Sequence, residues 1–186
     1  MTEIVILGIP GSLRAKAYST GLLRAAQELV PPDARVDLAD VRGFPVFNQD
    51  EETHVPDPVR RVKEQVRAAD AVLFGLNEHN YGLSAAEKNV LDWVSRPYPD
   101  NSWNGKPAGL LSVSIGQLGG ARAQYELRQS MVFLNMFPIN RPEVIVGGAA
   151  AKYDAEGRLT DPTARKLIGE HLVELVRHTR QLAARH

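Results

Sequence analysis

The alternation of short apolar runs with longer segments of helical periodicity is the feature of this sequence that most constrains its fold. Apolar runs predict five strands, at residues 4–9, 36–38, 71–76, 108–113 and 143–146. Apolar residues recur at helical spacing in segments that begin near Tyr18, Pro58, Ser84, Ala121 and Pro162. Ser84 with Glu87 has the spacing of a capping box, and Asp161 with Pro162 predicts the start of the last helix. Strands that alternate with helices form βαβ units, which make the sheet parallel and cover both of its faces.

The order of the strands follows from the handedness of these units. Right-handed crossovers leave few arrangements, and the natural order for five strands is 2-1-3-4-5. The expected fold class is therefore α/β, a flavodoxin-like three-layer sandwich around a five-stranded parallel sheet. We find no internal repeat or linker, so residues 1–186 are expected to form a single domain.

Composition argues against several classes of function. The 22 basic and 22 acidic residues cancel, so no net charge attracts nucleic acid or an anionic membrane surface. The chain has no cysteine, which excludes disulfides, thiolate catalysis and cysteine-ligated metal sites. No second histidine lies at metal-ligand spacing from His79, and no apolar run resembles a signal peptide or a membrane span. We expect a cytoplasmic protein that binds neither nucleic acid, nor membrane, nor metal.

The first candidate binding segment is the loop after the first strand. In sheets of this kind, ligands bind beyond the carboxyl ends of the strands, at the point where the winding direction reverses. The loop contains Gly11, Ser12, Arg14, Lys16 and Ser19 and leads into a helix. Free backbone N–H groups, a helix N-terminus and two cations suit a phosphate group. The alternative is an ordinary strand-to-helix turn with solvated cations.

The loops after the third and fourth strands have a different composition. Residues 77–82 (NEHNYG) combine amide and aromatic side chains, which suit a planar heteroaromatic ligand. Residues 114–122 (SIGQLGGAR) contain glycines that let the backbone approach a ligand closely. The alternatives are a solvent-exposed histidine in the one loop and a glycine-rich start of a helix in the other.

Three motifs in these segments carry a resemblance. They are Gly11-Ser12-Leu13-Arg14, Glu78-x-Asn80 followed by Lys88-Asn89-x-x-Asp92-Trp93, and Gly119-Gly120-Ala121-Arg122-Ala123-Gln124 followed by Leu127-Arg128-Gln129. Together they resemble the NADPH-dependent FMN reductase family, which includes bacterial quinone, chromate and azo-dye reductases. The resemblance covers nearly the whole chain, and each motif follows the expected strand.

The resemblance implies a single flavin mononucleotide (FMN)-binding domain and an FMN-dependent NAD(P)H oxidoreductase. FMN would be the cofactor and NAD(P)H the co-substrate, with hydride passing through flavin N5 to a small acceptor such as free flavin, a quinone or an azo compound. The residues implied to hold the FMN phosphate are Ser12, Arg14, Tyr18 and Ser19. Those implied to border the ring are Asn77, Glu78, His79 and Asn80 on one side and Ser114, Gly116, Gly119 and Gly120 on the other. Family members are usually homodimers or homotetramers, so a homo-oligomer is expected.

The sequence departs from the family pattern in the ring loop and the helix that follows it. The loop is normally Pro-Glu-Tyr-Asn, and here Asn77 and His79 replace the proline and the tyrosine. The usual Pro-Gly before the helix is Ser84-Ala85, and the customary leucine is Glu87. Loss of a proline and a glycine predicts a loop of different shape.

The expected mechanism requires no side-chain acid or base for hydride transfer to the flavin, because the cofactor carries that chemistry. His79 is the one residue placed to donate a proton to the acceptor. Two alternatives differ in class. A flavodoxin-type electron carrier is usually strongly acidic, which the zero net charge does not favour. A diverged family member in a specialised pathway, with altered or lost flavin use, would result if the changed ring loop no longer accepted the flavin.

Overall fold

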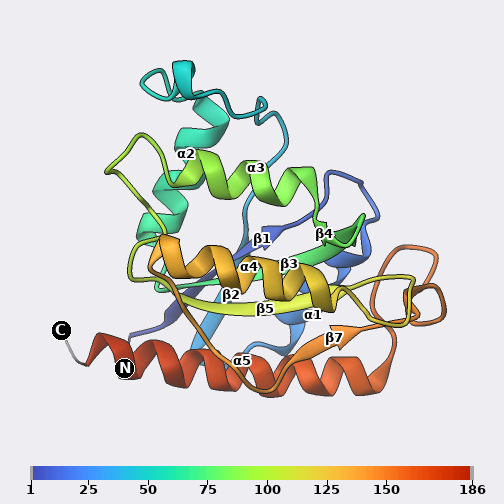
Figure 1. Cartoon of the computed structure of the whole chain (residues 1–186). Helices are drawn as coiled ribbons and strands as arrows, with labels where there is room; N and C mark the ends of the chain where they lie inside the picture. The colour runs from blue at the N-terminus through green and yellow to red at the C-terminus, as the bar shows by residue number, and fades with distance from the viewer. Residues whose placement is uncertain (1, 185–186) are drawn as a thin grey trace.

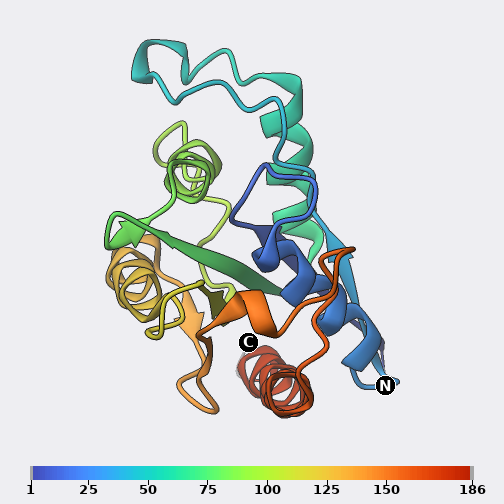
Figure 2. The ribbon, with the colours of Figure 1, turned by 90° about the vertical axis from the view of Figure 1, so that its right-hand side faces the viewer.

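The computed structural model describes residues 2–184, in which a sheet lies between two layers of helices (Figure 1, Figure 2). One layer consists of α1 (Tyr18–Leu29) and α5 (Pro162–Ala183). The other consists of α2 (Asp57–Ala68), α3 (Ala85–Val94) and α4 (Ala121–Leu134). Two short 3-10 helices, η1 (Gln49–Glu51) and η2 (Ala149–Ala151), lie in the connections.

Among the described residues the sheet has seven strands, five of which follow the order β2-β1-β3-β5-β6. Their bounds are β1 (Ile4–Pro10), β2 (Ala34–Leu38), β3 (Ala71–His79), β4 (Gly82–Leu83), β5 (Pro107–Val113), β6 (Phe137–Pro138) and β7 (Val144–Val146). All pairings are parallel except that of β4, which forms a hairpin with the end of β3. The predicted parallel α/β sandwich and its strand order are confirmed. The predicted number of strands, five, was too low, because the short strands β4 and β6 were not predicted.

The fifth predicted strand corresponds to β7, and the shorter β6 precedes it in the chain. The two strands pair with different parts of β5. β6 pairs with Pro107 and Ala108, and β7 pairs with the segment from Leu111 to Val113. Within residues 2–184, no strand lies on this edge of β5 beside Leu110. Its N–H instead donates to Nε2 of His171 in α5, at 3.1 Å. A buried imidazole thus takes the place of a strand partner, which no local pattern in the sequence would indicate.

The third strand is longer than predicted, and the segment predicted as a ring loop is mostly a hairpin. β3 continues to His79, and β4 pairs back onto it through Glu78–Leu83 and His79–Gly82 contacts. The two turn residues, Asn80 and Tyr81, have φ angles of 51° and 71°. Positive φ at both central residues is typical of the tight turns that match the twist of a hairpin.

The core consists of two clusters, one on each face of the sheet. Along β3, Leu73 packs toward α1 and α5, whereas Val72 and Phe74 pack toward the other three helices. This alternation follows from the pleat, which points successive side chains to opposite faces. All of β5 is buried, as is typical of a central parallel strand covered on both faces. Within residues 2–184, no helix combines the length and the apolar character needed to cross a bilayer.

Candidate functional site

A cleft of about 240 Å³ opens at the carboxyl ends of β1, β3 and β5, where the order of the strands predicts a ligand site. It brings together seven of the twelve predicted site residues, namely Ser12, Arg14, Tyr18, Asn77, Glu78, His79 and Ser114. Ala17, Val113 and Ile115 complete its wall. Residues from three segments that are far apart in the sequence therefore meet around one space.

The β1–α1 loop (residues 11–17) leads into the N-terminus of α1, where the first backbone N–H groups have no helical acceptor. The N-cap of α1 is Ala17, which makes no side-chain cap, and the first turn of the helix contains no acidic residue. The N–H groups at the start of the helix are therefore available to an anion. Within residues 2–184, the guanidinium group of Arg14 has no acidic partner. Tyr18 is fixed beside the cleft by its ring, which packs 4.7 Å from that of Tyr153.

Ser19, predicted to bind a phosphate, lies in the first turn of α1 behind the wall of the cleft. The residue is fully buried, and its hydroxyl has no hydrogen-bond partner in the described part of the chain. A buried hydroxyl without a partner is uncommon and often marks a group that a ligand or water completes. Its position and its free donor are compatible with the predicted role, although the residue does not line the cleft itself.

The β3–β4 hairpin is tied to the start of α4 by Glu78. Its carboxylate accepts the backbone N–H of Arg122 at 3.1 Å and pairs with the guanidinium group of Arg122 at 2.8 Å. The same guanidinium group lies 3.8 Å from the centre of the Tyr81 ring. Two of the three motifs are thus joined by an ion pair. Asn80 lies in the exposed turn of the hairpin and does not line the cleft.

The glycines of the β5–α4 loop lie differently from one another. Gly119 and Gly120 are buried with φ angles of 59° and 86°, and Gly120 is the N-cap of α4. A Cβ atom on Gly119 would lie 2.7 Å from the backbone nitrogen of Gly147, so this glycine packs against the segment after β7. Gly116 is exposed, and its N–H donates to the hydroxyl of Ser114 at 3.2 Å. None of the three glycines lines the cleft.

Glu87 belongs to this region, although the sequence predicted for it only a role in capping a helix. The predicted capping box is present, since Ser84 Oγ accepts the N–H of Glu87 while the Glu87 carboxylate accepts that of Ser84. The carboxylate also accepts the N–H of Asn77 at 2.8 Å. Burial raises the pKa of Glu87 to about 8, against the lowering effect of the N–H groups of Ser84 and Asn77. The capping-box spacing was the available signal, but nothing local pointed to Asn77.

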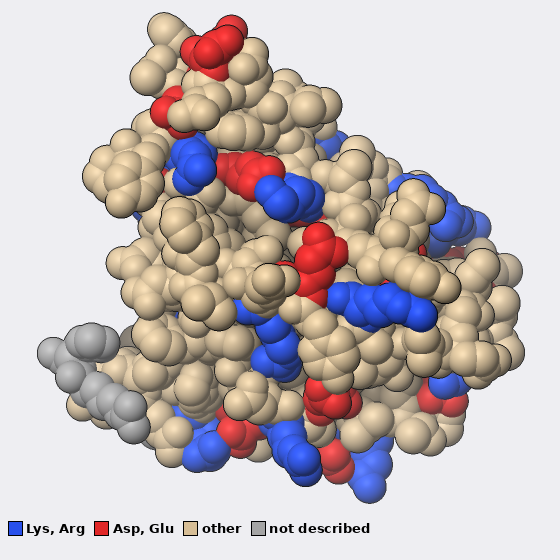
Figure 3. Space-filling model, viewed as in Figure 1, with Lys and Arg blue, Asp and Glu red and all other residues tan. Residues whose placement is uncertain are grey.

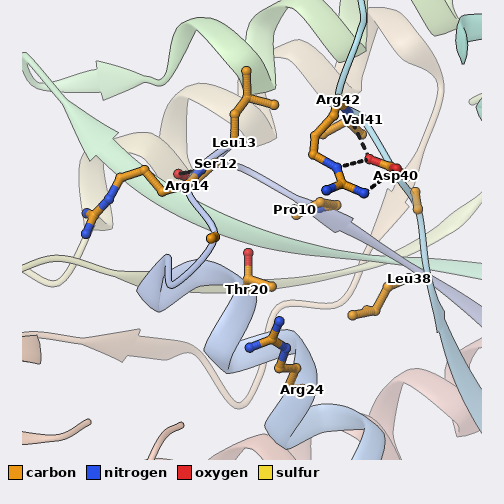
Figure 4. Close-up of a pocket in the computed structure, with 12 residues that line it drawn as sticks. Pro10, Ser12, Leu13, Arg14, Thr20, Arg24, Leu38, Asp40, Val41 and Arg42 are labelled. Carbon is orange, nitrogen blue, oxygen red and sulfur yellow. Dashed lines mark hydrogen bonds and ion pairs between the residues drawn. The ribbon is translucent and has the colours of Figure 1, made fainter. Parts of the chain in front are cut away.

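A second and larger cleft, of about 350 Å³, lies on the other side of the β1–α1 loop, between α1 and the end of β2 (Figure 4). Ser12 and Arg14 line both clefts, so this loop forms the wall between them. In the second cleft Arg42 is paired with Asp40, and Arg24 projects from α1. Only the first cleft touches the ends of β3 and β5. Residues 2–184 contain no group of three or more side chains suited to a metal ion.

Comparison with known proteins relates the whole chain to flavin-dependent reductases. The family model described as NADPH-dependent FMN reductase matches residues 4–151. An NAD(P)H-dependent FMN reductase of Pseudomonas aeruginosa is 46% identical over 181 residues, which cover 97% of each chain. A quinone reductase of Pseudomonas putida is 40% identical over 156 residues, covering 83% of this chain and 84% of the relative.

A solved structure agrees with these relatives. The flavoenzyme NAD(P)H:(acceptor) oxidoreductase FerB of Paracoccus denitrificans superposes with a TM-score of 0.86 at 29% identity. The superposition covers 96% of this chain and 98% of that protein. The two proteins therefore share the layered fold along nearly the full length.

Proposed function

The chain belongs to the NADPH-dependent FMN reductase family, and on that premise we propose that it is an FMN-dependent NAD(P)H oxidoreductase. The proposed site is the cleft between the β1–α1 loop, the β3–β4 hairpin and the β5–α4 loop. The electron acceptor is a small molecule such as a quinone or free flavin, as the names of the relatives suggest. The observation that carries the proposal is the meeting of these three segments around one cleft.

The donors on the β1–α1 side fit the phosphate of FMN. The uncapped N-terminus of α1 supplies backbone N–H groups, and Arg14 supplies a cation without an acidic partner in residues 2–184. A dianionic phosphate in the cleft would satisfy both. Asn77, His79 and Ser114 on the other side supply polar groups for a flavin ring.

FMN, when bound, supplies the capacity to take a hydride from a reduced nicotinamide and to pass electrons to a second acceptor. The residues of the chain then bind and orient. Glu78, fixed by Arg122, holds the hairpin against α4. Ile115 is 73% exposed at the edge of the cleft and offers an apolar surface for a planar acceptor. His79 is exposed on the wall of the cleft, and we propose that it donates a proton to the acceptor.

The proposal includes a homodimer or homotetramer that acts in the cytoplasm. Large apolar side chains are exposed on α4 and beside it, including Tyr125, Val132, Phe133 and Tyr98. Exposed apolar groups of this size commonly mark a protein interface. Basic and acidic side chains are interspersed on the face shown in Figure 3, which is the face on which α4 lies.

An absorption spectrum of the purified protein with added FMN tests the proposal. We expect a bound flavin that bleaches under argon on addition of NADPH or NADH and recovers its colour on addition of a quinone. A protein that stays colourless after FMN addition would contradict the assignment and favour a diverged member without flavin. A flavin that bleaches only when a protein partner is supplied would favour an electron carrier.

Two arginine variants locate the phosphate. Arg14→Ala removes a charge-assisted hydrogen bond, and we expect FMN affinity to fall roughly tenfold to a hundredfold. Arg24→Ala is the matched control, because Arg24 is an arginine on α1 that lines the second cleft and not the first. Its FMN affinity should stay within about twofold of the parent's. Riboflavin, which lacks the phosphate, should bind the parent and Arg14→Ala equally.

A further inference from the structure

Three of the departures from the family pattern, Asn77, Ser84 and Glu87, meet in one buried cluster behind the cleft. Glu87 is 4% exposed, and its carboxylate oxygens accept the backbone N–H of Asn77 at 2.8 Å and that of Ser84 at 2.7 Å. Prolines at these two positions would have no N–H to donate. Each donor that replaces a proline in this chain is therefore matched by an acceptor on Glu87.

The same cluster contacts the β1–α1 loop at Gly11. The carbonyl oxygen of Gly11 accepts from the side-chain amide of Asn77 at 2.6 Å and from the hydroxyl of Ser84 at 2.8 Å. A Cβ atom on Gly11 would lie 1.9 Å from Oε1 of Glu87, so the carboxyl group packs directly on this backbone. Gly11 directly precedes Ser12, and both Ser12 and Asn77 line the cleft. Glu87 thus lies one layer behind both sides of the proposed flavin site.

We propose that Glu87 is a positioning residue that holds the β1–α1 loop against the end of β3 and whose charge state sets the affinity of the site for an anionic phosphate. The inference rests on the proposed function, since the phosphate is that of FMN. A neutral carboxyl group leaves Arg14 and the N-terminus of α1 as the charges that a phosphate meets. An ionised carboxylate adds a negative charge beside Gly11, which opposes a dianion in a poorly solvated region.

The surroundings of Glu87 favour its neutral form. Burial raises the pKa of Glu87 to about 8, the N–H groups of Ser84 and Asn77 act in the opposite direction, and the charge of Glu126 on α4 raises it further. The neighbours contributed by β3 and by the β1–α1 loop, Asn77 and Gly11, do not titrate. Glu126 is therefore the charged group whose own ionisation must be controlled in a test.

Binding of FMN and binding of a proton by Glu87 should be coupled. Above about pH 7 the phosphate is already a dianion, so its own titration does not interfere. We expect the Kd for FMN to increase roughly tenfold between about pH 7 and pH 9.5 as the carboxyl group ionises. By the same linkage, the protein should take up protons when FMN binds near pH 8.

Quenching of FMN fluorescence across this pH range tests the inference. In Glu87→Gln the absolute Kd changes because one N–H loses its acceptor, but the dependence on pH should disappear. Glu126→Gln is the matched control, because the Glu126 carboxylate also accepts a backbone N–H of the hairpin, that of Leu83 at 2.7 Å, but is exposed. It should keep a pH dependence of the parent's size, displaced to lower pH because the charge of Glu126 no longer raises the pKa of Glu87. Riboflavin should bind the parent with little dependence on pH.

The outcomes separate the inference from the proposed function. A parent protein that binds FMN with a Kd independent of pH, or a Glu87→Gln variant with the parent's slope, would overturn the role of Glu87 and leave the flavin site in place. A parent protein that binds no FMN at any pH would overturn both. If Glu87→Gln does not fold, proton uptake by the parent on FMN binding at about pH 8 decides, since its absence contradicts the coupling.

Discussion

Glu87 and His171 play comparable structural roles on opposite faces of the sheet. Each is a buried titratable side chain that accepts a backbone N–H from a strand where the neighbouring strand is missing. Glu87 accepts that of Asn77, beyond the point where β1 ends beside Gly75. His171 accepts that of Leu110, in the gap between β6 and β7. A strand can therefore lack a neighbouring strand over a few residues without leaving a buried N–H unsatisfied, because a side chain supplies the acceptor.

A glycine makes room for the side chain in both places. A Cβ atom on Gly11 would lie 1.9 Å from Oε1 of Glu87, and one on Gly109 would lie 2.7 Å from Nε2 of His171. Real Cβ atoms do not approach other atoms this closely, so any larger residue would displace the acceptor. The two glycines thus have a packing role that is independent of backbone conformation.

The two acceptors differ in the pH at which they ionise and in what lies beside them. Burial lowers the pKa of His171 to about 4 and raises that of Glu87 to about 8. His171 also holds the backbone after β6, through the contact of its Nδ1 with the carbonyl oxygen of Pro142 at 2.8 Å. Only Glu87 adjoins the cleft. A buried side-chain acceptor can therefore serve the scaffold alone or also a ligand site, depending on which strand it pairs with.

The largest effect is expected from Glu87→Leu, which introduces the customary leucine of the family pattern. The change leaves the N–H groups of Asn77 and Ser84 buried without an acceptor. Each unsatisfied group costs about 1–3 kcal/mol, so we expect a loss of roughly 3–5 kcal/mol in the free energy of unfolding. Urea denaturation at neutral pH measures this loss.

A triple variant tests whether the loss comes from the unsatisfied donors. Adding Asn77→Pro and Ser84→Pro removes both N–H groups together with their acceptor. Ser84 has a φ of −66°, which is the value that proline imposes. We expect the triple variant to be more stable than Glu87→Leu, although it also lacks the cap of Ser84 and the two side-chain hydrogen bonds to the Gly11 carbonyl. A triple variant as unstable as Glu87→Leu would contradict the role of Glu87 as an acceptor.

The dependence of stability on pH should show the two residues acting in opposite directions. The folded pKa of Glu87 lies above its unfolded value, so the folded state binds more protons and stability falls as pH rises from about 4.5 to 8. The folded pKa of His171 lies below its unfolded value, so stability rises between about pH 4 and 6.5. Between about pH 4.5 and 6.5 the two residues change the free energy of unfolding in opposite directions. From about pH 6.5 to 8 only Glu87 contributes, and the free energy of unfolding should fall by roughly 2–3 kcal/mol.

Single variants separate the two contributions to the pH dependence of the free energy of unfolding, measured in the same denaturation series. In Glu87→Gln the stability should rise to about pH 6.5 and then stay level. In His171→Leu it should fall continuously from about pH 4.5 to 8. Identical profiles for the parent and either variant would remove that residue as a source of the pH dependence.

Alanine substitutions at Gly109 and Gly11 should affect the flavin site differently. Gly109→Ala forces the His171 imidazole to move, at an expected cost of roughly 1–2 kcal/mol, and should leave FMN affinity unchanged. Gly11→Ala displaces the Glu87 carboxylate and should lower both stability and FMN affinity. Denaturation and flavin titration of both variants measure the difference. Equal effects on FMN affinity would contradict the idea that only the Glu87 cluster serves the site.

Much of the fold was predictable because its signals are local. Apolar runs located the core strands, and the capping pairs Ser84 with Glu87 and Asp161 with Pro162 located the starts of two helices. The hairpin after β3 was missed because it depends on a positive φ at Tyr81, a residue that rarely adopts one. Split pairing beside β5 was missed because the partner of Leu110 comes from a helix far along the chain.

Part of the candidate site was also predictable from the sequence, and part was not. Ser12, Arg14 and the residues at the end of β3 were predicted because the order of the strands brings their loops together. Gly119 and Gly120 were predicted as ring contacts, and their positive φ angles and packing supply a structural reason for them that does not involve the cleft. The environment of Glu87 could not be predicted, because a single sequence does not show that Asn77 and Gly11 close around it.

His79 provides the last and smallest test, because it is a titratable residue of the cleft that is exposed rather than buried. His79→Phe should change the free energy of unfolding by less than about 0.5 kcal/mol, as substitutions at exposed positions usually do. If the imidazole donates a proton to the acceptor, quinone reduction should slow several-fold while bleaching of the flavin by NADPH keeps its rate. Stopped-flow measurement of the two half-reactions separates these effects. Equal rates in both would show that water supplies the proton, and the chemistry of the cleft would then depend on buried Glu87 rather than on exposed His79.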